Sequence, residues 1–478
     1  MNKSRLMDYI FYPGSIAVIG ASKDPEKERA MGWVGRLLEY GYKGKIYPVN
    51  PGATEILGLK AYPSIESIQD DIDYAIITLA APLVPEAVEK CAKKGVKVVH
   101  IFSAGFSETG DPERVKLQEE LKRVVDNTHI RAIGPNCFGV YCSASHIVCN
   151  RGLPKESGSI GLVCQTGMGM MLLIRLAKNR GLRFSKGISY GNAVDLSAED
   201  FLEYFMSDPE TKVIFTYIEG LKDGRRFFNI LRECVKVKPV VILKGGLSES
   251  GASAVASHTG SLAGSRRAWQ TLFKQTGVIP VESIQEAVEQ LVALLNVPSS
   301  IGGRRVGLVG RGGGAGVVAT DMCEREGLSV PRLPVDMKLQ LGKIIPSLAG
   351  SSVGNPVEIG LGAFGFSENY AEAVGIIGSH PQIDFIITFF FPAEYEEFLQ
   401  EGWLETASSQ LLTAKRSLSK PLIAVVDPGE SIEVFKWAKR LQQRCIEIEL
   451  ATFLSLEDAI KAVGKLIKYY EFKSHGTE

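Results

Sequence analysis

The sequence has no excess of either charge, no CxxC cysteine pair and no long apolar run. Its 54 lysines and arginines balance 54 aspartates and glutamates, so the formal net charge is zero. Nucleic-acid-binding domains normally carry a basic excess, so the composition argues against a nucleic-acid partner. The eight cysteines are scattered through the chain without metal-ligand spacing, so we expect buried, reduced thiols and no metal site.

Membrane and export signals are also missing from the sequence. The longest apolar segment, 385–391, is far shorter than the ~20 residues that a membrane-spanning helix needs. The first residues contain no apolar stretch typical of a secretory signal. We therefore expect a cytoplasmic protein with no membrane partner.

Two nucleotide-binding motifs are absent. The turn Gly20-Ala21-Ser22 follows an apolar run but does not complete the GxGxxG pattern of nicotinamide cofactor sites, and no P-loop occurs. A dehydrogenase of the dinucleotide-binding kind is therefore disfavoured.

What the sequence does contain is glycine, at 50 of 478 positions, which indicates many tight turns. Three segments, 15–22, 159–167 and 305–316, each join a short apolar run to a glycine turn and a helix-like pattern. This pattern is typical of the first strand–turn–helix unit of a doubly wound parallel sheet. The starts lie about 145 residues apart, which predicts three α/β domains at 1–150, 151–298 and 299–478.

Further alternation of strands and helices follows each start. The helix expected in the first third spans 84–94, and a turn-rich linker is expected at 296–303. The expected strands are 45–50, 74–79, 96–102, 213–218, 240–243, 385–391 and 422–426. Because these strands are apolar throughout, each sheet should be covered on both faces.

One histidine stands in an unusual setting. After the strand that ends near Leu243, a stretch of small residues reads as a long loop, in which Ser257, Thr259 and Gly260 surround His258. Neutral imidazole is a good nucleophile near pH 7 and can accept a phosphoryl group. A lone histidine is more often structural, so this local pattern leaves both interpretations open.

Two other segments would complete such a site. Glu219 follows the strand 213–218 and is a candidate hydrogen-bond partner for a nucleophilic histidine. Gln165, Thr166 and Gly167 lie where a strand ends and a helix begins, so backbone N–H groups and a hydroxyl could hold a phosphoryl group there. The alternatives are a surface carboxylate and an ordinary helix cap.

Taken together, these motifs resemble the alpha subunits of ADP-forming (NDP-forming) acyl-CoA synthetases and, more distantly, the succinyl-CoA synthetase alpha subunit. The resemblance covers nearly the whole chain in order. It is carried by AVIGAS (17–22), YPVNP (47–51), SAGFSETG (103–110), GPNCFGV (134–140), CQTG (164–167), SYGNAVDL (189–196), YIEG (217–220), SHTGSLAG (257–264), RGGGAGVVATD (311–321) and GNPVEIG (354–360).

The resemblance implies a fold and a set of site residues. The fold is α/β, with an N-terminal Rossmann-like CoA-binding domain followed by two flavodoxin-like domains. His258 would be phosphorylated and Glu219 would be its partner, while the phosphate site would include Gln165, Thr166, Gly167, Ser257, Thr259, Gly260, Asn136 and Glu108. The CoA site would include Gly20, Ala21, Ser22, Pro48, Asn50, Ala80, Pro82, Ser103 and Ala104.

The resemblance also implies partners and a reaction. Acyl-CoA, ADP and phosphate would give acid, ATP and CoA through acyl phosphate and phosphohistidine. Because we find no nucleotide-binding module, a separate ATP-grasp beta subunit is expected, in an α2β2 assembly that holds Mg²⁺ with the nucleotide. Thr166 replaces the family's usual serine, and Met168, Met170 and Met171 follow, which puts acetate preference in doubt.

Two alternatives stay open. The first is a non-catalytic regulator that binds CoA or acyl-CoA, and the second is a succinate-specific alpha subunit. The second class usually lacks a domain corresponding to residues after 303.

Overall fold

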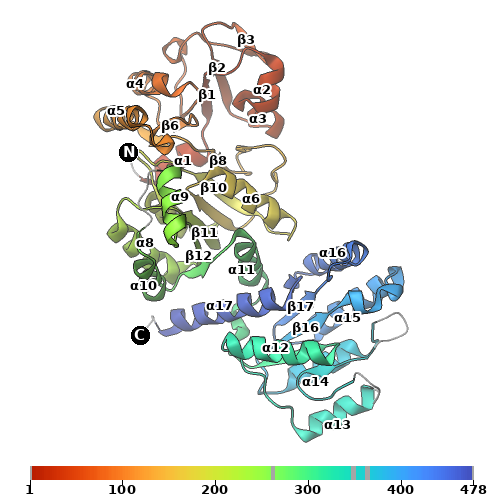
Figure 1. Cartoon of the computed structure of the whole chain (residues 1–478). Coiled ribbons are helices and arrows are strands. Elements are labelled where there is room, and N and C mark those ends of the chain that lie inside the picture. The colour runs from red at the N-terminus through yellow and green to blue at the C-terminus, as the bar shows by residue number, and fades with distance from the viewer. Residues whose placement is uncertain (1–2, 260–263, 346–350, 361–365, 476–478) are drawn as a thin grey trace. The chain divides into compact units, whose positions relative to one another are not determined.

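The computed structural model describes residues 3–259, 264–345, 351–360 and 366–475, and it divides the chain into two compact units. Unit 1 spans Met1–Ala287 and contains two large sheets, whereas unit 2 spans Val288–Glu478 and contains one. Figure 1 shows strands flanked by helices in both units. The α/β fold is confirmed, while the bounds of the three predicted domains stay predictions.

The first sheet of unit 1 has the strand order β2-β1-β5-β6-β7, and every pair is parallel. Its strands are β1 (Ser15–Ile19), β2 (Lys45–Val49), β5 (Tyr74–Ile77), β6 (Val98–Ile101) and β7 (Arg131–Ile133). The helices are α1 (Lys3–Phe11), α2 (Pro25–Met31), α3 (Trp33–Tyr40), α4 (Val84–Lys94) and α5 (Pro112–Thr128). Figure 1 shows α2 and α3 on one side of the sheet and α4 and α5 on the other. The small hairpin of β3 (Glu55–Ile56) and β4 (Leu59–Lys60) completes this part.

The second sheet has the order β13-β12-β11-β9-β10-β8. Its strands are β8 (Gly139–Tyr141), β9 (Ile160–Cys164), β10 (Phe184–Ser189), β11 (Val213–Ile218), β12 (Val240–Lys244) and β13 (Ile279–Val281). The helices around it are α6 (Gly167–Lys178), α7 (Ala198–Ser207), α8 (Gly224–Val237), α9 (Glu249–Thr259) and α10 (Arg266–Thr276). Helix α11 (Ile284–Asn296) follows β13, and the division between the two units falls within it. β8 was not predicted, and it pairs antiparallel with β10 at the edge of an otherwise parallel sheet.

Unit 2 contains the parallel order β15-β14-β16-β17-β18. Its strands are β14 (Val306–Gly310), β15 (Val357–Glu358), β16 (Phe385–Phe390), β17 (Leu422–Val426) and β18 (Thr452–Phe453). Its helices are α12 (Gly313–Arg325), α13 (Val335–Ile344), α14 (Tyr370–Ser379), α15 (Glu401–Ser417), α16 (Ile432–Glu447) and α17 (Leu456–His475). The strands β14, β16 and β17 are buried along their full length, as their continuous apolar sequences predict.

The expected loop after β12 is wrong over 249–259, where the chain forms helix α9. Three alanines, at 252, 254 and 256, supply the strongest helix-forming residue type, and Glu249 places a negative charge in the first turn. The small residues predict a long loop, but the alanines among them favour a helix.

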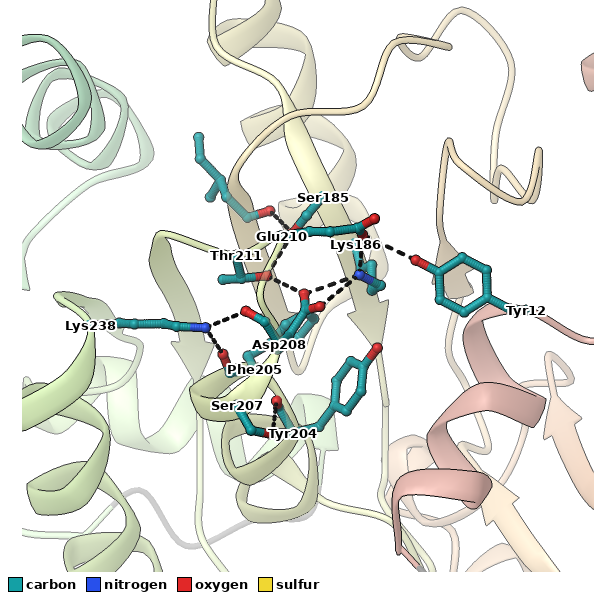
Figure 2. A network of polar contacts seen from close by, with 11 residues as sticks. Tyr12, Ser185, Lys186, Tyr204, Phe205, Ser207, Asp208, Glu210, Thr211 and Lys238 are labelled. Atoms are coloured by element: carbon teal, nitrogen blue, oxygen red, sulfur yellow. Dashed lines mark hydrogen bonds and ion pairs between the residues drawn. The ribbon is translucent and has the colours of Figure 1, made fainter.

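A buried lysine anchors the second sheet. Lys186 on β10 is 1% exposed, and its Nζ lies 3.0 Å from both carboxylate oxygens of Asp208 and also contacts Glu210. Figure 2 shows these contacts together with Thr211, which donates to Asp208 over 2.6 Å, and Tyr12, which donates to Glu210 over 3.1 Å. The network therefore ties the residue after α1 to the second sheet.

Replacing Lys186 by methionine should destabilise unit 1 by about 3–5 kcal/mol, because the buried Asp208 carboxylate loses its counter-charge. Urea unfolding followed by circular dichroism measures the change. Lys45→Met, which breaks the exposed ion pair with Asp70, should leave the unfolding midpoint almost unchanged. Equal midpoints for the Lys186→Met variant and the wild type would contradict this role.

No helix in the described part of the chain combines the length and the apolar character needed to cross a membrane.

Candidate phosphoryl-transfer and CoA site

The carboxyl ends of β9, β11 and β12 meet at one edge of the second sheet, because these strands are adjacent. The residues that follow them include Gln165, Glu219 and Gly245. The Gln165 side-chain oxygen accepts hydrogen bonds from the backbone N–H groups of Glu219, at 2.8 Å, and Gly220, at 3.1 Å. Gln165 therefore holds the turn that presents Glu219, a contact that the sequence pattern did not reveal.

Glu219 is a buried carboxylate, 3% exposed, with defined neighbours. The Tyr217 hydroxyl donates to Glu219 Oε1 over 3.1 Å, and Lys244 Nζ donates to the Glu219 main-chain oxygen over 2.8 Å. Burial raises the pKa of Tyr217, and the Glu219 charge raises it further. Burial lowers the pKa of Lys244 to about 8, and Glu219 partly offsets this effect. Tyr217 and Lys244 are thus additional members of the site.

Helix α6 begins beside this turn. Thr166 is its N-cap, with extended backbone (φ −109°, ψ 134°), and within the described residues its hydroxyl makes no capping hydrogen bond. A Cβ on Gly167 would lie 1.8 Å from Phe138 Cδ2, so only glycine fits against this ring. The Phe138 side chain thus packs directly on the helix start, where backbone N–H groups and the helix dipole favour an anion.

The segment with His258 follows β12 at the same edge. Its backbone forms the last turn of α9, which lies against the 3₁₀ helix η3 (Ser107–Thr109) of the first sheet's loops. The side chains of Ser257, His258 and Thr259, and all of Gly260, fall outside the described residues. Their parts in the site stay predictions.

A loop of the first sheet reaches the second sheet through Glu108. Its Oε1 accepts from the Gly105 N–H at 2.6 Å, and its Oε2 accepts from Asn192 Nδ2 at 2.7 Å. Asn136, with a φ of +58°, is near by, since its Nδ2 lies 3.4 Å from Asn192 Oδ1. Glu108 therefore orders its own turn and links it to Asn192, while contact of Glu108 or Asn136 with phosphate stays a prediction.

A separate pocket of about 400 Å³ opens at the carboxyl edge of the first sheet. Four residues of the predicted CoA site line it, namely Gly20, Ala21, Ser22 and Asn50, and their contact with CoA stays a prediction. The other lining residues are Val18, Lys23, Lys27, Glu28, Met31, Gly32, Trp33, Gly52, Thr78 and Phe102. Gly20 has a φ of +91°, and a Cβ there would lie 2.9 Å from Thr78 Oγ1, so the turn requires glycine.

Two side chains shape the turn at this pocket. Asn50 Nδ2 donates to the Ala21 main-chain oxygen over 2.8 Å. The Glu28 carboxylate, 1% exposed, accepts from the N–H groups of Ser22 at 2.7 Å and Val34 at 2.8 Å. The exposed Lys23 and Lys27 add positive charge at the pocket.

An aromatic pair connects this pocket with the start of α6. Phe102 lines the pocket, and its ring meets that of Phe138 edge-on at a centroid distance of 5.6 Å. Phe138 in turn contacts Gly167. The two rings therefore form a continuous packing contact between the pocket lining and the helix start.

Comparison with known proteins agrees with this arrangement. Residues 14–143 match the family model described as a CoA binding domain, and residues 157–294 match the succinyl-CoA ligase like flavodoxin domain. The alpha subunit of acetate–CoA ligase (ADP-forming) I from Pyrococcus furiosus is 35% identical over 99% of both chains. The chain belongs to the family of ADP-forming acyl-CoA synthetase alpha subunits.

Longer and structurally characterised members of this family match as well. Acetate–CoA ligase (ADP-forming) I of Archaeoglobus fulgidus is 36% identical over 82% of this chain. The chain spans only 56% of that protein's length. The acetyl-coenzyme A synthetase 1 of Ca. Korarchaeum cryptofilum, solved with phosphate and ADP, superimposes with a TM-score of 0.83 at 30% identity, covering 98% of each chain. The predicted family and fold are therefore confirmed.

The remaining residues of the expected CoA site do not line this pocket of the acyl-CoA synthetase family member. Of the described residues, Pro48, Ala80, Pro82, Ser103 and Ala104 are not among those lining the pocket. Pro48 is buried in β2, and Ser103 Oγ donates to the Leu79 main-chain oxygen over 2.5 Å. Their contact with CoA stays a prediction.

Sequence reasoning also missed several residues at both sites. Asn192 lies inside the motif SYGNAVDL, and Lys244 directly follows the predicted strand 240–243, so the sequence marked their positions without showing their contacts. Lys23 and Lys27 both follow the glycine turn 20–22, and this pair of charges was a usable signal for an anionic ligand.

Proposed function

We propose that this chain is the acyl-CoA-binding and phosphoryl-carrying subunit of an ADP-forming acyl-CoA synthetase. The observation that supports it most strongly is the meeting of Gln165, Glu219 and the start of α6 at the edge from which the His258 segment departs. A buried carboxylate beside an anion-favouring helix start suits a histidine that accepts and donates a phosphoryl group.

The reaction proceeds in three substitutions. A phosphate oxygen attacks the thioester carbonyl carbon, the C–S bond breaks, and the CoA sulfur leaves and takes up a proton. A His258 ring nitrogen then attacks the phosphorus of the acyl phosphate, and the carboxylate leaves as the P–O bond breaks. An oxygen of ADP finally attacks phosphohistidine, and the N–P bond breaks to give ATP. Each step is reversible.

The chain's own residues act by positioning and by electrostatics. The pocket beside Gly20 holds CoA, and the Phe102–Phe138 pair leads the thioester toward α6. The α6 N-terminus and the Thr166 hydroxyl bind phosphoryl oxygens. Glu219 accepts a hydrogen bond from His258 and so orients the imidazole.

The proposal includes a partner. An ATP-grasp beta subunit would bind ADP, in an α2β2 assembly, and Mg²⁺ would neutralise nucleotide charge there. The described residues of this chain contain no group of three or more histidine, cysteine, aspartate or glutamate side chains that could hold a metal ion. The proposal places the metal with the nucleotide in the partner subunit.

CoA binding can be tested separately from phosphoryl transfer. Lys27→Glu should raise the dissociation constant for CoA about tenfold, because it reverses a charge at the pocket, and high salt should reduce the difference. Isothermal titration calorimetry measures this, with Lys43→Glu, an exposed change outside the pocket lining, as the matched control. Equal dissociation constants for CoA in both variants and the wild type would show that this pocket is not part of the CoA site.

The central test uses protein purified from its own host, so that a partner subunit stays bound. Incubation with ³²P-phosphate and a panel of acyl-CoAs should place acid-labile, base-stable label on this chain. The acyl-CoA that gives label identifies the substrate. Absence of label with every acyl-CoA, despite measured CoA binding and a bound partner, would overturn the enzyme proposal and favour the CoA-binding regulator, which the comparisons do not favour.

A further inference from the structure

The segment that carries His258 lies between two residues, Lys244 and Gly264, that both contact the indole ring of Trp269. Lys244, the last residue of β12, has its Nζ 5.0 Å from the centroid of the Trp269 ring on α10. Gly264, with a φ of +75°, lies so close to Trp269 that a Cβ there would be 3.1 Å from Nε1. Trp269 is 5% exposed, so both contacts are made with a buried, well-packed side chain.

Lys244 also joins this indole to the Glu219 turn. Its ammonium donates to the main-chain oxygen of Glu219 over 2.8 Å and to that of Gly245. Gly245 itself must lack a side chain, because a Cβ there would lie 2.7 Å from the Tyr217 hydroxyl. The Tyr217 hydroxyl donates to the Glu219 carboxylate, so these five residues form one packed cluster.

We propose that Lys244, held under the Trp269 indole, is a positioning residue for phosphoryl transfer, which fixes the Glu219 turn and the start of the His258 segment relative to each other. This inference rests on the proposed function. Lys244 is 5% exposed, so its buried charge needs the two carbonyl oxygens and the indole face that surround it. Loss of the ammonium would free both the turn and the segment that it holds.

Lys244→Met should slow formation of phosphohistidine about 30- to 100-fold in a single turnover. Losses of this size are typical when a group that orients a reacting residue is removed. The KM for acyl-CoA should stay within about twofold, because the CoA pocket does not include Lys244. Lys244→Arg keeps the charge and the donors and should restore much of the rate. Rapid-quench measurement with ³²P-phosphate at several acyl-CoA concentrations gives both the phosphorylation rate and the KM.

The pH profile gives a second readout. Burial lowers the pKa of Lys244 to about 8, so the wild-type rate should fall as pH rises through 8 and the ammonium loses its proton. The ionisable groups that act at this cluster are Tyr217 on β11 and Glu219 directly after it, and α10 contributes the Trp269 ring. The alkaline fall should vanish in Lys244→Met and move to higher pH in Lys244→Arg.

Lys238 offers a matched control at the other end of the same strand. It precedes β12, its pKa is also lowered by burial, and its Nζ donates to the main-chain oxygens of Phe205, at 2.7 Å, and Asp208. Figure 2 shows the Lys238 side chain directed at these two oxygens. Lys238→Met should therefore leave the phosphorylation rate and its pH profile unchanged.

The outcomes separate this inference from the proposed function. No label on the wild type would reject the function itself. Label on the wild type together with an unchanged rate in Lys244→Met, or an equal loss in Lys238→Met, would overturn the positioning role. If Lys244→Met does not fold, as judged by circular dichroism, Lys244→Arg decides: an alkaline limb identical to the wild type overturns the inference.

Discussion

Replacing His258 by asparagine should reduce net acyl-CoA-dependent ATP synthesis at least a thousandfold. Asparagine keeps a polar side chain of similar reach but has no nitrogen able to accept a phosphoryl group, so the covalent intermediate cannot form. The measurement is ATP production by the complete enzyme from acyl-CoA, ADP and phosphate. Binding of CoA should persist, because the pocket beside Gly20 belongs to the first sheet.

A histidine elsewhere supplies the control. His129 ends helix α5 with a φ of +57°, a left-handed conformation that asparagine adopts readily. His129→Asn should therefore leave both turnover and stability close to the wild type. Turnover that survives in the His258→Asn variant would reject the phosphohistidine relay even if His129→Asn behaves as expected.

Replacing Glu219 by glutamine should slow phosphohistidine formation about a hundredfold. Glutamine preserves the shape and can still accept the hydrogen bond from Tyr217, but it removes the negative charge that would stabilise a charged imidazole. In the wild type the Glu219 charge raises the pKa of Lys244, so removing that charge should lower this pKa. Single-turnover labelling across pH measures both effects.

A second buried carboxylate tests whether burial alone explains the slower phosphohistidine formation expected for Glu219→Gln. Glu199 on α7 is as well buried as Glu219, at 2% exposed, and accepts a hydrogen bond from Ser197. Glu199→Gln should retain the labelling rate, and its stability measures the cost of neutralising a buried carboxylate beside the same sheet. An unchanged rate in Glu219→Gln would remove Glu219 from the site.

The predicted strands agree closely with the structure wherever the sequence is continuously apolar. The segments expected at 213–218 and 422–426 are β11 and β17, and the helix expected at 84–94 is α4. Strands buried on both faces leave a strong local signal, because nearly every residue must be apolar. The short edge strand β8 lacks that signal, since its three residues are defined by pairing with β10.

The candidate site likewise combines positions that the sequence predicted with contacts that only the fold created. The sequence placed Gln165 and Glu219 after strands, and the strand order then brought them together as hydrogen-bond partners. The role of Gln165 as an acceptor for the Glu219 turn required the neighbouring position of β9 and β11, which sequence distance does not encode. Small residues in 245–264 predicted a loop, and alanine propensity with packing against η3 produced helix α9 instead.

By itself the sequence determined the α/β class, the family and the residue types that can carry phosphoryl chemistry, because these depend on local composition and motif order. The tertiary structure decided which of them touch. Lys244 gained its partners only when β12 lay beside β11 and α10 packed Trp269 over its ammonium. Burial, and with it the pKa of about 8, is likewise a property of packing, since it depends on what surrounds a charge rather than on its place in the chain.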